Sequence, residues 1–479
     1  MVRVDSDRIF NEQPRAREIL ERLEKEGYRA VVVGGAVRDL LRGVYEEDYL
    51  FRPEEVDVDI ATSATPAEVK ETFPDYSYVA VGESFGVLVL VSPDGEEYEV
   101  AQFRTESEYD GRKPDEVEPA DSLEEDVMRR DFTVNGMALE LDGRVIDHVD
   151  GIDDLKQKKV RAIGDPFERF REDYLRPLRA VRVACDLDGE IDPATEEAIE
   201  AVADKITDIS WERIKEELFN ILSTDRSEEG LRLLKKNGML SRILPEMTSN
   251  EGVPQPEEYH PEGDVLEHSF LALGVADRLG FPELTKLAVF LHDVGKAPAY
   301  RKNDGEHLGG HAGESERLVG EIASRLKLSN REKEELSWLA ANHMRGSILP
   351  EMRKAKQVKL VRHNRDLSFP LNDPLNRFGY FKNLLRVIIA DSEASAHGVD
   401  GWLPALKKFT ELLPHLKSLE ELGSARKLID GNDLLELGMD EGPELGQVLN
   451  AVHEEIYSGE IDDREEALNL AEELIEARI

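Results

Sequence analysis

The feature that most constrains the fold is a glycine pair between an apolar run and a helical pattern. Residues 28–33 read Tyr-Arg-Ala-Val-Val-Val, which predicts a short strand, and Gly34-Gly35 end it before a helix from Ala36 to Leu41. Glycines at such a junction let backbone N–H groups approach a phosphate, and the helix N-terminus adds partial positive charge. Arg38 adds a fork of donors for the same anion. The segment therefore predicts an anion-binding turn between strand and helix.

Two carboxylates follow in Val56-Asp57-Val58-Asp59-Ile60. The alternation predicts a strand, and the i, i+2 spacing then points Asp57 and Asp59 to the same face. Two like charges held this close are costly unless a cation lies between them, and Mg²⁺ prefers carboxylate oxygens. Taken alone, the same pattern also fits an edge strand with a solvated acidic face.

The pattern of elements changes along the chain. Three more strands are predicted at 78–81, 85–91 and 97–103, with a turn at 93–95. From residue 153 onward the pattern is helical, and Pro- and Gly-rich breaks at 244–264 and 367–379 divide it. We therefore expect an α+β domain followed by three helical parts, with bounds 1–150, 151–245, 246–400 and 401–479.

Composition excludes several classes of protein. The 61 Lys+Arg against 102 Asp+Glu leave a net charge of −41, which argues against polyanion binding by charge alone and fits a salt-adapted proteome. The single cysteine, Cys185, excludes a disulfide scaffold and a Cys-based zinc site, and we expect it in the core. No secretory signal and no run of ~18 apolar residues is found, so a cytoplasmic protein without a membrane span is expected.

Further blocks extend the first two motifs in a fixed order. They are Gly34–Asp39, Asp57–Asp59, Arg129–Asn135, Arg169–Arg182 and Ile209–Ile214. In this order the blocks resemble the class II tRNA nucleotidyltransferases (CCA-adding enzymes) and bacterial poly(A) polymerases, within the DNA polymerase β-like superfamily. The resemblance implies a nucleotidyltransferase head at 1–150 and a helical, nucleotide-selecting and RNA-binding neck at 151–245. It also implies tRNA, CTP and ATP as partners; no oligomeric state is predicted.

The resemblance assigns roles in phosphoryl transfer. Asp57 and Asp59 would hold Mg²⁺, which activates the attacking 3′-hydroxyl and neutralises the triphosphate. Glu99, in Tyr98-Glu99-Val100, is the candidate third catalytic carboxylate, although a solvated strand position fits it equally well. Arg130 falls on the family's triphosphate-contacting arginine, and Gly35 and Arg38 on its phosphate-binding turn.

The stretch Glu172-Asp173-x-x-Arg176 carries nucleotide selection in the family. Its spacing alone fits an ordinary salt bridge on one helix face. The resemblance implies that these side chains pair with the Watson–Crick edge of the incoming nucleotide. A carboxylate accepts from the amino group of C or A and a guanidinium donates to a ring nitrogen or carbonyl, whereas U and G present a carbonyl instead. Arg179 and Arg182 continue the face and would reach the phosphates.

Two segments bear on which nucleotides are added. Residues 82–86, Gly-Glu-Ser-Phe-Gly, hold an acid where poly(A) polymerases of the family carry a basic stretch. Residues 103–115 resemble the full flexible loop of enzymes that add the terminal A. We therefore expect CCA addition, with A addition and polyadenylation as alternatives.

A second set of motifs lies in the helical half. It comprises His268, His292 and Asp293 in Leu-His-Asp-Val-Gly-Lys, His311, His343 and Asp391. The set resembles the HD phosphohydrolase superfamily, which implies an HD domain at 246–400 and a helical tail at 401–479. His268, His292, Asp293 and Asp391 would hold one divalent metal, and His311 and His343 fit additional ligands for a second metal or a phosphate.

Imidazole with carboxylate suits Mn²⁺, Ni²⁺, Fe²⁺ or Zn²⁺ better than Mg²⁺. A hydrolase whose main activity is this site, or a helical body that only grips tRNA, are the alternatives.

One basic cluster stands out in the acidic chain. Lys354, Lys356, Lys359 and Arg362 are expected to contact tRNA phosphates, with a solvated helix face as the alternative.

Overall fold

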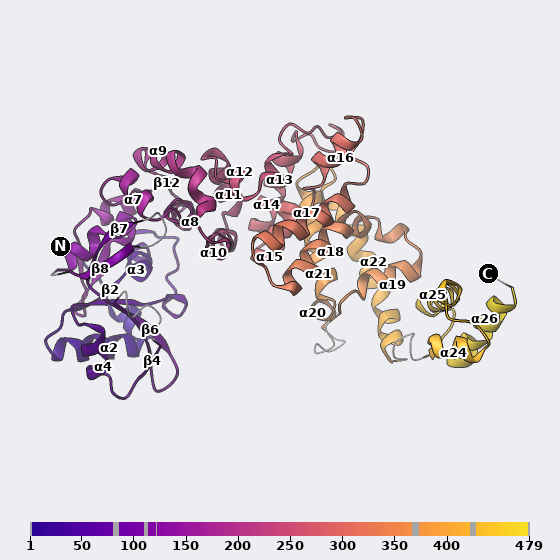
Figure 1. The fold of residues 1–479 in the computed structure, drawn as a ribbon, viewed down its shortest axis with the longest axis horizontal. Coiled ribbons are helices and arrows are strands. Elements are labelled where there is room, and N and C mark those ends of the chain that lie inside the picture. The colour runs from indigo at the N-terminus through magenta and orange to yellow at the C-terminus, as the bar shows by residue number, and fades with distance from the viewer. Residues whose placement is uncertain are drawn as a thin grey trace. The chain divides into compact units, whose positions relative to one another are not determined.

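The computed structural model describes residues 2–79, 86–109, 114–120, 122–365, 373–421 and 428–477. The chain forms two compact units, residues 1–243 and 244–479. Figure 1 shows strands and helices together toward the indigo end of the chain, and helices in the orange and yellow part.

The first unit is built on an eight-stranded mixed sheet. In sheet order the strands are β1 (Val2–Arg3), β10 (Arg144–Asp147), β9 (Met137–Leu139), β2 (Ala30–Val33), β3 (Asp59–Thr62), β6 (Glu97–Gln102), β5 (Val87–Val91) and β4 (Ser77–Val79). Strands β3 and β6 pair in parallel, and the other neighbours pair antiparallel. All four residues of β2 are buried, as its run of apolar residues requires in a central strand.

Helices surround and extend this sheet. They are α1 (Asp7–Phe10), α2 (Pro14–Lys25), α3 (Gly35–Tyr45), α4 (Pro66–Thr72), α5 (Leu123–Met128), α6 (Gly151–Lys156), α7 (Pro166–Glu172), α8 (Arg176–Leu187), α9 (Pro193–Val202), α10 (Trp211–Ser223), α11 (Ser227–Lys236) and α12 (Leu240–Ile243). Two smaller sheets pair β7 (Arg104–Tyr109) with β8 (Pro114–Pro119), and β11 (Lys159–Val160) with β12 (Glu190–Ile191).

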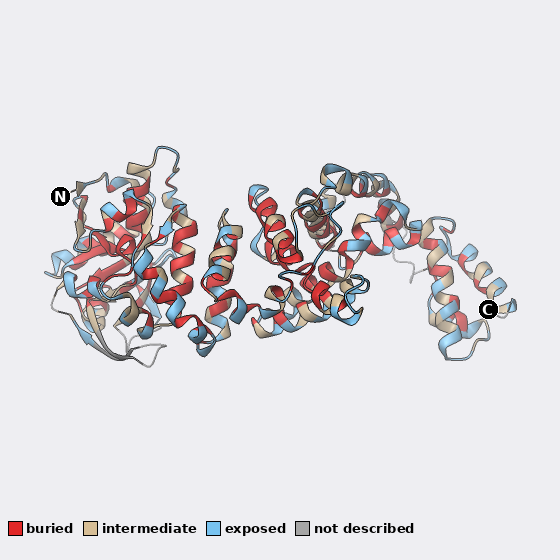
Figure 2. Cartoon of the chain, turned by 90° about the horizontal axis from the view of Figure 1, so that it is seen from above, coloured by how far each residue is buried: buried red, intermediate tan, exposed pale blue. Residues whose placement is uncertain are grey.

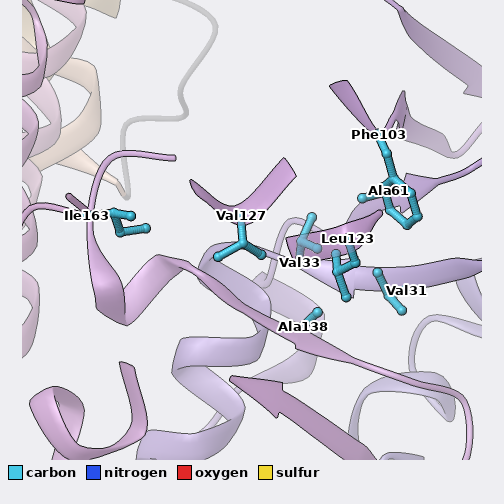
Figure 3. Packing of buried hydrophobic residues seen from close by; sticks show 8 residues of the cluster. All are labelled: Val31, Val33, Ala61, Phe103, Leu123, Val127, Ala138 and Ile163. Carbon is cyan, nitrogen blue, oxygen red and sulfur yellow. The ribbon is translucent and has the colours of Figure 1, made fainter. Parts of the chain in front are cut away.

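A buried apolar cluster fixes α5 against the sheet. Its members are Val31, Val33, Ala61, Phe103, Leu123, Val127, Ala138 and Ile163 (Figure 3). They come from β2, β3, β9 and α5 and from two connecting segments, so segments distant in sequence share one core. Burial of these side chains fixes the start of the Arg129–Asn135 block beside strand β2.

The second unit is helical. Its helices are α13 (Pro245–Thr248), α14 (Val265–Arg278), α15 (Glu283–Leu291), α16 (Lys296–Lys302), α17 (His311–Arg325), α18 (Asn330–Ser347), α19 (Lys354–Val361), α20 (Pro374–Arg377), α21 (Gly379–Glu393), α22 (Gly398–Glu421), α24 (Gly431–Glu436), α25 (Pro443–Ser458) and α26 (Arg464–Glu476). Helix α14 is buried along most of its length and packs against α15 and α21. Red and blue positions alternate along many other helices in Figure 2, as expected for helices with one buried face. None of the helices in the described ranges is long and apolar enough to cross a membrane.

The structure differs from the sequence-based expectation in three places. Strand β3 begins at Asp59, so Asp57 precedes the strand instead of lying on it. The segment 103–115 contributes to a hairpin, β7–β8, whose residues 110–113 lie outside the described part. The segment expected to be wholly helical contains the short pair β11–β12. The predicted antiparallel meander is confirmed as β4, β5 and β6.

Candidate active site and metal centre

The first unit contains a pocket of about 640 Å³ lined by many charged side chains. Seven are arginines: Arg38, Arg104, Arg129, Arg130, Arg176, Arg179 and Arg182. Six are carboxylates: Asp39, Asp57, Asp59, Glu99, Asp131 and Asp173. In a chain with net charge −41, such a concentration of arginine suits a compact anion.

Strand register brings two of the predicted carboxylates together. Strands β3 and β6 pair Ile60 with Val100, which places Asp59 beside Glu99 on adjacent strands. Asp57 lines the same pocket from the segment before β3. Burial, followed by the neighbouring charges of Glu99 and Asp57, raises the pKa of Asp59 to about 7. A cation held among these carboxylates would relieve their repulsion, so the donor set fits a divalent metal.

The predicted glycine turn closes tightly against these carboxylates. Gly34 has φ +76°, a left-handed conformation that favours glycine, and a Cβ there would lie 3.4 Å from Asp59 Oδ2. Helix α3 begins at Gly35, so its first N–H groups border the pocket. Arg38 is 7% exposed, and it donates from Nε to Asp39 Oδ1 (2.9 Å) and from Nη1 to Asn135 Oδ1 (3.1 Å). The turn and Arg38 are therefore fixed before any ligand binds.

A buried carboxylate that the sequence analysis missed, Asp126, holds two pocket arginines. Arg129 donates from Nε and Nη2 to Asp126 Oδ1 at 2.9 and 2.7 Å. Arg130 donates from Nε and Nη2 to Asp126 Oδ2 at 3.2 and 2.9 Å. Asp126 lies on α5, three residues before Arg129 and four before Arg130, and this spacing was the signal in the sequence that could have identified it.

The stretch from Glu172 to Arg176 does not form one continuous helix. Helix α7 ends at Glu172 and α8 begins at Arg176, yet Arg176 Nη1 donates to Glu172 Oε2 across the break. Asp173 takes a different partner, since Arg213 of α10 donates to its Oδ2 at 2.7 Å. Asp173 and Arg176 line the pocket, while Glu172 also accepts from Arg169 at 2.8 Å. Arg213 was missed as a site residue, although its block was recognised.

The remaining two predicted arginines are also anchored. Arg179 Nη2 lies 2.8 Å from Asp131 Oδ2, and Arg182 Nε donates to Glu217 Oε2 at 2.9 Å. Burial opposes ionisation of Asp131, but Arg179 and other arginines outweigh it and lower the pKa of this carboxyl. Both arginines start from α8 and reach the pocket with orientations set by their acid partners.

In the second unit the predicted histidines and aspartates converge. His268 Nε2 lies 3.0 Å from Asp391 Oδ1, and His292 Nε2 lies 3.7 Å from the same oxygen. Asp293 Oδ1 lies 3.4 Å from His311 Nε2 and 3.5 Å from His343 Nε2. Two groups of possible ligand atoms result, each within 4.8 Å: His268, His292 and Asp391, and Asp293, His311 and His343.

The opposite ring nitrogens of these histidines are all occupied by acceptors. Nδ1 donates to a backbone carbonyl in three of them: His292 to Val289 (2.6 Å), His311 to Leu308 (3.0 Å) and His343 to Ala340 (2.7 Å). The fourth, His268, donates from Nδ1 to Glu262 Oε1 at 2.7 Å. A neutral imidazole with the proton on Nδ1 presents a lone pair at Nε2.

The centre of this cluster is lined by imidazole Nε2 atoms and carboxylate oxygens. The Nε2 atoms of His311 and His343 lie 3.3 Å apart, and both face Asp293. Within the described ranges, neither His292 Nε2 nor Asp293 Oδ1 has a hydrogen-bond partner, although both are buried. Buried acceptors facing one another are costly without a cation, so the residues fit a divalent metal.

The basic cluster on α19 is only partly at the surface. Lys354, Lys356 and Lys359 are exposed, and Lys359 lies 3.7 Å from Glu454. Arg362, by contrast, is 8% exposed and lies over the Tyr457 ring. The prediction that Arg362 contacts RNA therefore conflicts with its position, because its guanidinium packs between elements of the unit.

Comparison with protein families agrees with both sites. Residues 30–161 match the poly(A) polymerase head domain, and residues 190–250 match the probable RNA- and SrmB-binding site of polymerase A. Residues 265–365 match the HD domain. These matches place a poly(A) polymerase-type head at the charged pocket and an HD domain at the histidine–aspartate cluster.

Two curated relatives of this chain are named CCA-adding enzymes. The chain is 48% identical over 217 residues to a CCA-adding enzyme of Pediococcus pentosaceus, covering 45% of this chain and 52% of that one. It is 42% identical over 244 residues to the CCA-adding enzyme of Lactococcus lactis, covering 50% and 58%. The chain thus aligns with little more than half the length of these curated relatives.

Solved structures extend the likeness to almost the whole chain. The Bacillus stearothermophilus CCA-adding enzyme, solved in complex with CTP, has a TM-score of 0.67 and 26% identity, with 98% of both chains covered. The Thermotoga maritima enzyme, solved with tRNA, shares the fold at a TM-score of 0.55 and 20% identity, over 98% of this chain and 96% of that one. The chain is thus similar in fold to CCA-adding enzymes over nearly its whole length.

Asp126→Asn tests whether one carboxylate holds both arginines. Burial alone would raise the pKa of Asp126, but Arg129 and Arg130 outweigh it and keep the pKa below its ordinary value. Its stabilising effect is therefore complete above an unfolded-state pKa of ~3.9 and is lost as pH falls through the lower folded-state pKa. At neutral pH the variant should lose ~3–5 kcal/mol of stability, as when one partner of a buried ion pair is removed.

Hydrogen exchange of the β2 and β9 amides at neutral and acidic pH measures this loss. The difference between variant and wild type should begin to shrink below ~pH 4, where the carboxyl of the unfolded chain takes up a proton, and should vanish as pH falls through the lower folded-state pKa. A loss of equal size at both pH values would show that the charge of Asp126 is not responsible.

Proposed function

We propose that this protein adds C, C and A to the 3′ end of tRNA from CTP and ATP, without a nucleic-acid template. The observation that carries the proposal is the pocket in which Asp59 and Glu99 lie beside the Gly34-Gly35 turn and face seven arginines. Such a site suits transfer of a nucleotide from a triphosphate, which requires carboxylate-held metal and neutralised phosphates. The relatives named CCA-adding enzymes support tRNA as acceptor.

Asp57, Asp59 and Glu99 are the residues that would hold Mg²⁺ in this reaction. The metal supplies a lower pKa for the attacking 3′-hydroxyl and positive charge at the triphosphate. The chain itself binds and orients the nucleotide. Arg130, Arg179 and Arg182 bind phosphate oxygens, with the turn at Gly35 and Arg38 lining the same pocket.

Nucleotide choice rests on Asp173 and Arg176, which face the pocket side by side from the α7–α8 junction. The Asp173 carboxylate accepts from the amino group of C or A, and the Arg176 guanidinium donates to a ring nitrogen or carbonyl. Glu172 orients Arg176, and Arg213 orients Asp173. Uracil and guanine present a carbonyl where Asp173 needs a donor, so they are rejected.

This proposal divides the chain into four functional parts. Residues 1–150 form the nucleotidyltransferase head and 151–245 the neck, followed by the HD domain at 246–400 and the helical tail at 401–479. The exposed Lys354, Lys356 and Lys359 bind tRNA phosphates, because exposed ammonium groups release counterions when they meet a nucleic-acid backbone.

The alternatives of A addition and polyadenylation depend on residues 82–86 and 103–115. Residues 82–85 lie outside the described part, so the acidic character of 82–86 enters only as sequence. The segment 103–115, which resembles the full loop of enzymes that add the terminal A, supports CCA addition over the alternatives.

Three tRNA transcripts, ending before CCA, after C and after CC, separate these activities. With Mg²⁺, CTP and ATP, the protein should complete CCA on all three, as read by single-nucleotide sizing. Asp59→Asn should abolish extension, whereas Asp48→Asn, which removes a charge from an exposed position in the same unit, should not. Extension of the CC-ended transcript alone identifies an A-adding enzyme, and long oligo(A) identifies a poly(A) polymerase.

Arg213→Gln tests nucleotide selection without altering a residue that lines the pocket. Without its ion pair, Asp173 loses the orientation that pairing with C and A requires. Discrimination against UTP and GTP should fall by ~5–150-fold, equivalent to the ~1–3 kcal/mol of one well-oriented base contact.

Single-turnover incorporation of each of the four nucleotides measures this ratio. Arg242→Gln, at an exposed position of the same unit, is the matched control and should leave the ratio unchanged. An Arg213→Gln variant that is slower with all four nucleotides by the same factor would contradict a role in selection.

A second activity, metal-dependent phosphoester hydrolysis, is favoured by the histidine–aspartate cluster. Its Nε2 atoms and carboxylates converge on two positions that suit Mn²⁺, Ni²⁺, Fe²⁺ or Zn²⁺. A cavity of about 470 Å³ opens beside them, and the Nζ of its lining residue Lys296 lies 2.6 Å from Asp293 Oδ2. A metal there supplies an activated water for hydrolysis, and Lys296 adds positive charge for a phosphate.

Asp293→Asn should lower divalent-metal uptake by this cluster and leave CCA addition intact. Asp293 contributes to both ligand groups through contacts with His292, His311 and His343, so its loss removes charge from each. Metal content after dialysis against Mn²⁺ is the readout, with Asp400→Asn at an exposed position as control. Retention of the full wild-type metal content in Asp293→Asn would exclude the cluster as the binding site.

A further inference from the structure

The two ligand groups of the second unit differ in what supports their histidines. In the group of Asp293, His311 and His343, both imidazoles donate from Nδ1 to backbone carbonyls. In the group of His268, His292 and Asp391, His268 donates to the carboxylate of Glu262 instead. A carboxylate behind a ligating imidazole fixes the ring and raises the basicity of its Nε2 more than a neutral carbonyl does.

Glu262 is well placed to act through His268. Its side chain is 6% exposed, and its Oε1 accepts from both His268 Nδ1 (2.7 Å) and His260 Nδ1 (2.9 Å). In the described ranges Glu262 Oε2 is buried without a hydrogen-bond partner. Among the interactions seen in the described ranges, the Glu262 carboxylate contacts the two imidazoles and its own backbone amide, and it contacts no arginine or lysine.

The other group experiences the opposite influence. Lys296 Nζ lies 2.6 Å from Asp293 Oδ2, so an ammonium competes with any metal for the charge of that carboxylate. Asp391, by comparison, contacts His268 and His292. Glu262 behind His268 thus raises the metal affinity of the His268–His292–Asp391 position. Lys296 beside Asp293 lowers the metal affinity of the Asp293–His311–His343 position.

We propose that Glu262 is a positioning residue which makes the His268–His292–Asp391 position bind divalent metal first and more tightly than the Asp293–His311–His343 position. This inference rests on the proposal that the cluster holds metal. It assigns to the chain a stepwise loading order that follows from the juxtaposition of Glu262 with His268 and of Lys296 with Asp293.

Calorimetric titration of the full-length, EDTA-treated protein with Mn²⁺ tests the order. An Asp57→Asn, Asp59→Asn background removes binding by the head, so that uptake reports the second unit. Two unequal steps are expected. Glu262→Ala should weaken the tighter step by ~10–100-fold, the usual effect of removing a carboxylate behind a ligating histidine, and leave the weaker step within about twofold.

Glu262→Gln separates charge from geometry, because its amide oxygen still accepts from His268 Nδ1 without a negative charge. It should weaken the tighter step less than Glu262→Ala does. Glu258→Gln, which removes the same charge from an exposed position in the same segment, should change neither step. Circular dichroism of each variant verifies that the helical unit is folded.

The outcomes distinguish this inference from the proposal beneath it. Uptake of Mn²⁺ in two steps that Glu262→Ala leaves unchanged, or weakens equally, overturns the role of Glu262 and keeps the metal centre. Absence of Mn²⁺ uptake by the Glu262-intact background overturns both.

Discussion

Pairing of buried charge is the constraint on which the first unit depends. An arginine or carboxylate taken out of water is costly unless a partner of opposite sign lies within hydrogen-bond distance. The pocket meets this condition by giving its arginines acid partners outside the reacting centre, such as Asp126 for Arg130 and Glu217 for Arg182. In the described part of the chain, no ion pair is seen for Asp57, Asp59 or Glu99, and burial together with mutual repulsion raises the pKa of Asp59. The arginines are thus pre-organised for an anion, and the carboxylates beside the glycine turn fit a cation.

The two candidate sites solve the same electrostatic problem with different donors. The head gathers carboxylates on parallel strands and surrounds them with guanidinium groups, which suits a hard cation that bridges to phosphates. The helical unit gathers imidazoles whose Nδ1 atoms face backbone carbonyls or the Glu262 carboxylate, so that their Nε2 atoms meet at the centre of the cluster. Imidazole ligands suit softer metals than Mg²⁺. Protonation of Nε2 would block these atoms, so a proton competes with any metal there.

The sequence predicted the candidate site residues well where they lie close together in a motif. The Gly34-Gly35 turn, the Asp59–Glu99 pair and the His292-Asp293 dipeptide all lie in the sites expected for them. Sequence failed where contacts join distant segments. Arg213 and Glu262 act through Asp173 and His268, and spacing cannot reveal a partner that tertiary packing supplies. Asp57 was placed on a strand because alternation mimics one, and Arg362 was placed in solvent because a basic run hides which side chain the fold buries.

The parallel pairing of β3 with β6 has a consequence for how this head tolerates change. Asp59 and Glu99 are neighbours only because Ile60 faces Val100 in register, and side chains alternate along a strand. A slip of β6 by one residue would present Tyr98 or Val100 to the pocket and turn Glu99 to the opposite face. A change of length in the β5–β6 turn, which directly precedes β6, would therefore have to leave Ile60 paired with Val100. The length of the β5–β6 connection thus contributes to the position of the Glu99 carboxylate in the pocket.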